Sequence, residues 1–212
     1  MLSTTHPTRR SLLGATLLGG MVLVAPRTVW AGGVDGAASS ISRLNVALLA
    51  VMKSGGAPFS QRFDTLAPVI DQTFDLQHIL RVSVGLHWAD ISPDEQTRLL
   101  TAFRRYTIAN YVANFDRWSG QSLSVEPPRD QGGATVVTTR ISGGSDDPIV
   151  LGYVMQQVTD GWRVVDVLAD GTISRVAVQR SDFRSLLTHG GSEALLTSLE
   201  RKTSDLSGGA LA

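Results

Sequence analysis

The chain has 212 residues, with 19 basic and 19 acidic side chains, and it contains no cysteine. The absence of cysteine excludes disulfides, thiolate catalysis, thiolate zinc sites and a lipid-modified N-terminal cysteine. The charge balance lacks the basic excess with which a nucleic-acid binder neutralises phosphates.

The first thirty-one residues have the features of an export signal. Arg9-Arg10 forms a basic segment, and the apolar run over residues 12–25 is shorter than the roughly 20 residues that span a membrane. Small residues at 29 and 31 lie where a signal peptidase reads the chain, so we expect cleavage after Ala31. A short N-terminal membrane anchor is the alternative.

The residues from Thr8 to Leu13 resemble the twin-arginine signal, through which folded proteins are exported, and the general secretory route is the alternative. Cleavage would remove three arginines and no acid, which leaves 16 basic and 19 acidic side chains and a net charge of −3. Without a cysteine the mature protein would carry no acyl anchor. We therefore expect it to be free in the periplasm.

Residues 37–118 are predicted to be helical. Apolar residues at three- and four-residue spacing indicate helices over 37–53, around residues 63–70 and from Asp75 to Gly85. The next helix is the best marked, because Ser92-Pro93-Asp94-Glu95 reads as a capping box with proline in the first turn. It is expected to reach Trp118 as a rod of roughly 38 Å, which could form the wall of an interior space or be an ordinary core helix.

Residues 121–176 are predicted to form an antiparallel sheet, because the connections are too short for crossovers. Thr135 to Ile141 is expected to pair with Gln121 to Glu126, and Asp160-Gly161 to turn a hairpin. Period-two alternation in the strand after that hairpin places four side chains on one face, those of Trp162, Val164, Asp166 and Leu168.

The end of the chain is predicted to return to helix. Closing helices are expected over residues 177–203, with a break at Gly190-Gly191, and a flexible tail over residues 204–212. A turn cluster over residues 143–148 lacks the ligand spacing of a calcium loop.

The search for catalytic and metal-binding groups finds little. His78, His87 and His189 are not spaced as metal ligands on one helix would be. Asp166, in the middle of an apolar strand, is either a general base in a cavity or, in the favoured interpretation, a structural acid. The structural acid would point to solvent or pair with Arg163, Arg175 or Arg180. These groups indicate no metal site.

Three ordered blocks of residues resemble one family. They are Phe74-Asp75-Leu76 with Arg81, Gly85 and Trp88; Phe103 and Tyr106 with Tyr111 to Phe115; and Gly161 to Val167 with Asp170-Gly171, Ser174, Arg180 and Phe183. Together they resemble the periplasmic phospholipid-shuttle and toluene-tolerance proteins of the MlaC type, nearest to the hopanoid-biosynthesis-associated (HpnM-like) branch. The resemblance runs from about residue 40 to 202. It departs from the family pattern at Thr172-Ile173, which precedes Ser174, and at Gln179-Arg180, where tyrosine-arginine is common.

The resemblance implies an α+β fold, in which a curved antiparallel sheet, cystatin-like and cone-shaped, packs against several helices with an apolar cavity between. It implies a lipid-binding domain over residues 32–203 that carries a phospholipid or a hopanoid. The implied partners are an inner-membrane ABC transporter and an outer-membrane lipoprotein, with the carrier itself a monomer. The resemblance implies no cofactor and no catalysis.

The lipid is expected in a closed apolar cavity between the sheet and the long helix. The side chains predicted to contact it are Leu80, Phe103, Tyr106, Tyr111, Leu151, Tyr153, Trp162 and Val164, although core packing explains the same residues. Two other functions stay open at this stage. One is a cavity-bearing isomerase or dehydratase that acts on a lipid, and the other is a scaffold of a lipid-synthesis complex that binds no lipid.

Overall fold

The computed structural model describes residues 33–143 and 147–211, so the expected signal over residues 1–31 lies outside the described residues. Within those two ranges, no helix combines the length and the apolar character needed to cross a membrane.

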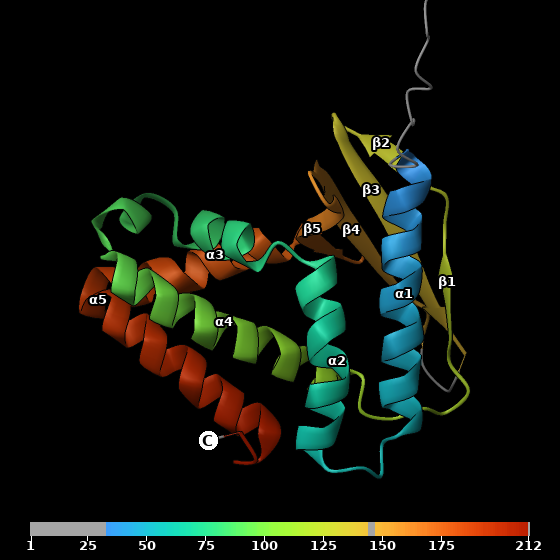
Figure 1. Cartoon of the computed structure of the whole chain (residues 1–212), viewed down its shortest axis with the longest axis horizontal. Helices are drawn as coiled ribbons and strands as arrows, with labels where there is room; N and C mark the ends of the chain where they lie inside the picture. Colours follow the sequence, from blue (N-terminus) through green and yellow to red (C-terminus); the bar gives the residue numbers. More distant parts are fainter. Residues whose placement is uncertain (1–32, 144–146, 212) are drawn as a thin grey trace, which may run out of the picture.

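A curved antiparallel sheet forms one side of the molecule (Figure 1). In the described residues it contains β1 (Ser122–Val125), β2 (Arg129–Gln131), β3 (Ala134–Ser142), β4 (Ile149–Val158), β5 (Gly161–Ala169) and β6 (Ile173–Ser174). The strand order is β1-β3-β4-β5-β6, and β2 pairs with the opposite end of β3 from β1. The predicted pairing of β1 with β3 and the hairpin that joins β4 to β5 are confirmed.

The helices lie on and beside this sheet. They are α1 (Val34–Lys53), α2 (Phe59–Thr73), α3 (Leu76–Val84), the 3-10 helix η1 (Gly85–Asp90), α4 (Pro93–Asn114) and α5 (Arg175–Ser207). Helix α1 packs across the sheet, whereas α4 and α5 run side by side in a separate layer with α3 (Figure 1). Helix α2 contacts α1, α4 and β5, so it joins the two layers. The α+β class predicted from the sequence is confirmed.

The apolar face predicted for the first helix anchors α1 to the sheet. Ile41, Leu44 and Leu48 are completely buried. Between them, the Asn45 amide donates to the Thr139 hydroxyl of β3 over 3.0 Å. A buried polar pair of this kind is stable only when its partners meet, so it fixes how the helix sits on the strand.

The capping box predicted for the fourth helix is present. The Glu95 backbone N–H donates to the Ser92 hydroxyl, and the Ser92 backbone N–H donates to the Glu95 carboxylate. The helix ends at Asn114 rather than at Trp118, because Phe115 leaves helical geometry with φ −114° and ψ 49°. Its 22 residues give a rod of about 33 Å, shorter than expected.

A bulge in β5 changes which side chains share a face. The strand carries one extra residue relative to β4, since the register gives the successive pairs Val154↔Asp166 and Met155↔Val164. Alternation placed Val164, Asp166 and Leu168 together, and this expectation is wrong. Beyond the bulge it is Val167, opposite the buried Tyr153, that continues the inner face of Val164.

The C-terminal segment differs from its prediction in its boundaries. Strand β6 is short and α5 begins at Arg175, because the Ser174 side chain caps the helix by accepting from the Ala177 N–H. The break expected at Gly190-Gly191 is a kink, with Gly191 at φ 64°. The helix continues to Ser207, past the boundary expected at residue 203, and the Ser207 side chain is buried.

Candidate functional site

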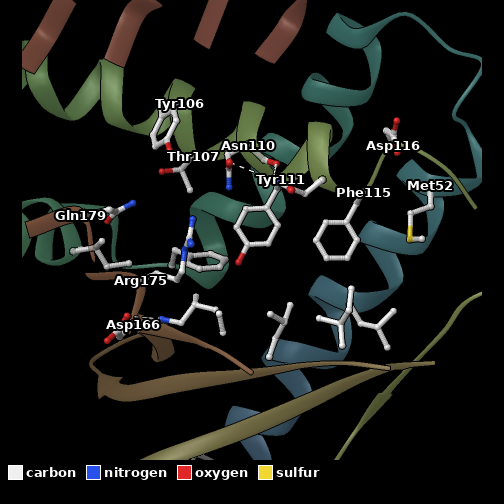
Figure 2. Close-up of a pocket in the computed structure, with 18 of the residues that line it drawn as sticks. Met52, Tyr106, Thr107, Asn110, Tyr111, Phe115, Asp116, Asp166, Arg175 and Gln179 are labelled. Atoms are coloured by element: carbon white, nitrogen blue, oxygen red, sulfur yellow. Dashed lines mark hydrogen bonds between the residues drawn. The ribbon is translucent and has the colours of Figure 1, made fainter. Parts of the chain in front are cut away.

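A pocket of about 810 Å³ lies between α4 and the sheet (Figure 2). This is the position expected for the cavity, but the pocket is not closed. Exposed residues form part of its edge, among them Asp116 and Arg117 after α4 and Asp147 before β4. The pocket therefore opens to solvent, and its volume is typical of a small-molecule site.

One stripe of α4 forms the upper wall. Its lining residues recur at three- and four-residue spacing, which places them on one face of the helix: Phe103, Tyr106, Thr107, Asn110, Tyr111 and Asn114. The stripe is apolar and aromatic at its centre and carries amide side chains towards the helix end.

The opposite wall is apolar. Strand side chains form the floor, namely Ile141, Ile149, Leu151, Val167 and Ala169, and the start of α3 adds Leu76 and Ile79. Aromatic rings close the inner end, where Phe74 meets Tyr111 edge-on with ring centroids 5.5 Å apart. Tyr111 also stacks on Phe115 at 6.0 Å. Such walls favour a ligand with a large apolar body.

The tyrosines of the pocket carry neutral hydroxyl groups. Burial raises the pKa of Tyr111 well above its usual range and also raises the pKa of Tyr106. Both hydroxyls therefore stay protonated at neutral pH. Figure 2 shows the Tyr111 hydroxyl pointing into the pocket.

Four of the eight residues predicted to contact lipid line the pocket, and these are Phe103, Tyr106, Tyr111 and Leu151. The other four lie outside its lining. Leu80, Tyr153 and Val164 are buried in the core, and Trp162 is half-buried. Val164 is covered by the α2–α3 junction, because its carbonyl accepts from the Asp75 N–H over 3.0 Å.

Other lining residues were not predicted. Asn110 is four residues after Tyr106, so helical periodicity would have identified it. Val167 reaches the floor only because of the bulge in β5, and Arg175 reaches the pocket only because α5 starts beside β5. No local pattern indicates those two positions.

Asp166 has a structural environment that differs from the expected one. Its carboxylate accepts from the Ser174 hydroxyl and from the backbone N–H groups of Val167, over 2.7 Å, and Val176, over 3.0 Å. The expected pairing with an arginine is wrong. The carboxylate instead holds the junction between β5 and α5 through these three hydrogen bonds.

The three histidines noted in the sequence do not line the pocket. In the described ranges, no cluster of three His, Asp or Glu residues could hold a metal ion. His78 is half-buried on α3. His189 is exposed and contacts the Ser185 carbonyl one turn earlier on its own helix.

Comparison with known proteins gives two results. A family model described as "MlaC protein" matches residues 43–201. The fold is similar to that of a phospholipid-binding protein from Ralstonia solanacearum, solved in complex with a phospholipid, with 19% sequence identity and a TM-score of 0.70. That match covers 81% of this chain and 98% of the other. A search of curated proteins found no match.

Proposed function

The chain belongs to the MlaC family, and from that premise we propose that it is a lipid-binding carrier and not an enzyme. The observation that carries the proposal is the pocket of about 810 Å³ between α4 and the sheet, with apolar walls and an open edge. The acyl tails of a lipid lie against Leu151, Val167 and Phe103, and its headgroup lies at the edge.

The energetics of lipid transfer require such a pocket. Each methylene removed from water contributes about 0.8 kcal/mol of transfer free energy. Two tails with ~14 methylenes each therefore represent roughly 20 kcal/mol. A carrier must replace most of that stabilisation and yet release the lipid. We infer that release takes place on a partner that opens or distorts the pocket.

The carrier works in the periplasm, after removal of residues 1–31, as a monomeric domain over residues 32–203. Its partners are an inner-membrane lipid ABC transporter and an outer-membrane lipoprotein, and its cargo is a phospholipid or a hopanoid. The similarity to the Ralstonia solanacearum protein, which was solved with a phospholipid, supports the first kind of cargo.

Two features favour the carrier over its rivals. A scaffold that binds no lipid has no need of a pocket of this size. An isomerase or dehydratase would need an available acid or base at the pocket, and the hydrogen bonds from Ser174 and Val176 already engage the Asp166 carboxylate.

Extraction of the native protein tests the proposal. Protein purified from its own periplasm should release a lipid into organic solvent in about one-to-one ratio, as measured by mass spectrometry. Delipidated protein incubated with the same lipid should rebind it and return it with unchanged mass. Native protein that contains no lipid would contradict the carrier, and a lipid returned with altered mass would indicate an enzyme.

A further inference from the structure

The segment that joins α4 to β1, residues 115–121, borders the open end of the pocket, and we call it the strap. Its residues 116–120 are exposed to solvent. Figure 2 shows Asp116 at this end of the pocket, beside Phe115. The strap shares the end with the connection from β3 to β4, which contributes Gly143 and Asp147 to the lining. A lipid that enters or leaves at this end therefore passes the strap.

Hydrogen bonds inside the strap give it a shape of its own. The Trp118 indole N–H donates to the Gln121 carbonyl over 2.9 Å. The Ser119 N–H donates to the Gln121 side-chain oxygen over 2.6 Å, and the Gln121 amide donates back to the Ser119 hydroxyl over 3.0 Å. Because these bonds join strap residues to one another, they do not tie the strap to the rest of the molecule.

The two ends of the strap are anchored by the elements that they join. Phe115 is buried and its ring stacks on Tyr111 of α4, with centroids 6.0 Å apart. At the other end β1 begins to pair with β3. Just before β1, the Gly120 carbonyl lies against Gly143, where a Cβ would approach it to 2.7 Å. That contact joins two glycines, so it has no side chains that interlock.

Lys53 holds the middle of the strap to the end of α1. Its ammonium lies 5.3 Å from the centroid of the Trp118 ring. Trp118 is 46% exposed and Lys53 is exposed as well, so the contact lies on the surface. Beside it, the Asp116 carbonyl approaches Gly55, again as backbone against a glycine. A cation over an indole at an exposed site is attracted only modestly, so this contact breaks and re-forms readily.

The Lys53–Trp118 contact lies outside the site that it borders. Neither residue lines the pocket, so neither contacts a molecule held there. The contact therefore stabilises the closed strap equally in the empty and the loaded protein. Its loss would lower the barrier to opening by the same amount in both states. The rates of entry and exit would rise together, and their ratio, which is the affinity, would stay the same.

We propose that the strap is the gate of the pocket, and that the contact between Lys53 and Trp118 is the latch that sets how fast the gate opens. The inference rests on the proposed function, because it takes the pocket to exchange a lipid. The buried Phe115 and the start of β1 keep the ends of the strap in place, and the latch controls the part between them.

Exchange kinetics of the latch variants test the proposal. The probe is a phosphatidylglycerol with one fluorescent tail, bound to delipidated protein and then displaced by an excess of the unlabelled lipid in stopped flow. Lys53→Met removes the ammonium and keeps the length of the side chain. We expect both its association and its dissociation rate constants to rise about two- to five-fold, as the loss of one exposed cation–π contact implies, with an unchanged Kd. Lys53→Arg keeps the cation and should not exchange faster than the wild type.

Two controls separate the latch from a general loss of charge or stability. Arg62→Met removes a cation that lies 5.6 Å from the Phe59 ring on α2, away from the pocket lining, and it should keep wild-type rates. In a Trp118→Leu background, Lys53→Met should have no further effect, because its partner is already absent. Melting curves establish that each variant is folded.

A covalent bridge tests the same gate in the opposite direction. The chain has no cysteine, so Lys53→Cys with Trp118→Cys gives one pair of thiols. Bridging this pair with a flexible bismaleimide closes the latch permanently. The bridged protein should exchange the probe at least about ten-fold more slowly than the same variant before bridging.

The outcomes separate this inference from the proposed function. If the wild type does not bind the labelled lipid, the carrier itself is contradicted. If it binds, and both Lys53→Met and the bridged protein exchange at unchanged rates, the gate is wrong while the carrier stands. If Lys53→Met raises only the dissociation rate and so weakens affinity, Lys53 stabilises the loaded state and the latch is wrong as well.

Discussion

Asp166 illustrates how a single partly buried acid can have a structural role. Its carboxylate receives the Ser174 hydroxyl and the Val176 N–H, and these bonds fix the start of α5 against β5. Arg175 and Gln179 lie in the first turns of that helix. The positions of these two pocket-lining side chains therefore depend on Asp166.

Asp166→Asn is expected to lower stability without abolishing lipid binding. Asparagine replaces one accepting oxygen with a donor, so the variant loses a charged hydrogen bond and about 1–3 kcal/mol of unfolding free energy. Thermal melts and bound lipid per folded protein are the measurements. The matched control is Asp170→Asn, because Asp170 has φ 51° in a turn where asparagine is tolerated. If a normally folded Asp166→Asn protein completely failed to complement a deletion strain, the enzyme would be favoured instead.

Gly55, after α1, lies against the backbone of the segment that follows α4, so a side chain at this position has no room. A Cβ at this position would lie 2.6 Å from the Asp116 carbonyl oxygen, on the segment that forms the far edge of the pocket. Gly55→Ala should therefore cost about 1–3 kcal/mol, because backbone has to move. The neighbouring Gly56 has open space around it, so Gly56→Ala should be near neutral. Equal denaturation midpoints for the two variants would contradict this packing.

Helix α4 is the element on which the site depends most. Its capping box at Ser92 and Glu95 fixes where it begins, and the Glu95 carboxylate also accepts from Ser192 of α5. Phe103 near its middle is buried and packs edge-on against Phe183 of α5, with centroids 6.3 Å apart. The helix is thus held by α5 on one side, which leaves the other side free to line the pocket.

A charged side chain on either wall of the pocket should lower the affinity for lipid more than it lowers the stability of the fold. Tyr106→Asp changes α4 and Leu151→Asp changes β4, and both positions line the pocket. A carboxylate there stays hydrated or becomes neutral, and either way it displaces the tails, so we expect a loss of about ten-fold in affinity. Bound lipid per protein and a thermal melt are measured together.

The matched control for those two variants is Val46→Asp. Val46 is 69% exposed on α1 and does not line the pocket. It should therefore keep a full complement of lipid. If both wall variants fold and retain lipid as the control does, the pocket is not the binding site.

At the scale of the whole molecule, the two layers create the site between them. Helix α1 packs across the sheet, and α4 and α5 run side by side in a separate layer (Figure 1). The pocket is lined by residues of both layers. Binding of tails would join the layers, so we expect the loaded protein to melt at a higher temperature than the delipidated one.

The N-terminal segment, residues 1–31, is predicted to be removed when the protein is exported. We expect the protein from the periplasm to begin at or next to Gly32 and to carry no acyl anchor, because small residues occupy 29 and 31 and cysteine is absent. The intact mass of the exported protein is the measurement. A full-length chain found only in the membrane fraction would support the N-terminal anchor instead.

The sequence by itself determined the elements whose signals are local. Ser92 and Glu95 marked the start of α4, Gly85 the end of α3, and Asp160-Gly161 the hairpin between β4 and β5. Each signal acts within a few residues, because a cap or a tight turn satisfies neighbouring backbone groups. Together with the three blocks that resemble the family, they were enough to predict the fold class and the two walls of the pocket.

Only the tertiary structure decided which side chains meet at the site. Because of the bulge in β5, Val167 and not Leu168 lies on the inner face. The Asp166 carboxylate accepts from Ser174 and does not pair with an arginine. Arg175 entered the pocket because α5 begins beside β5. These outcomes depend on strand register and on partners from different elements. Alternation and spacing along the chain describe one element at a time, so they cannot specify such contacts.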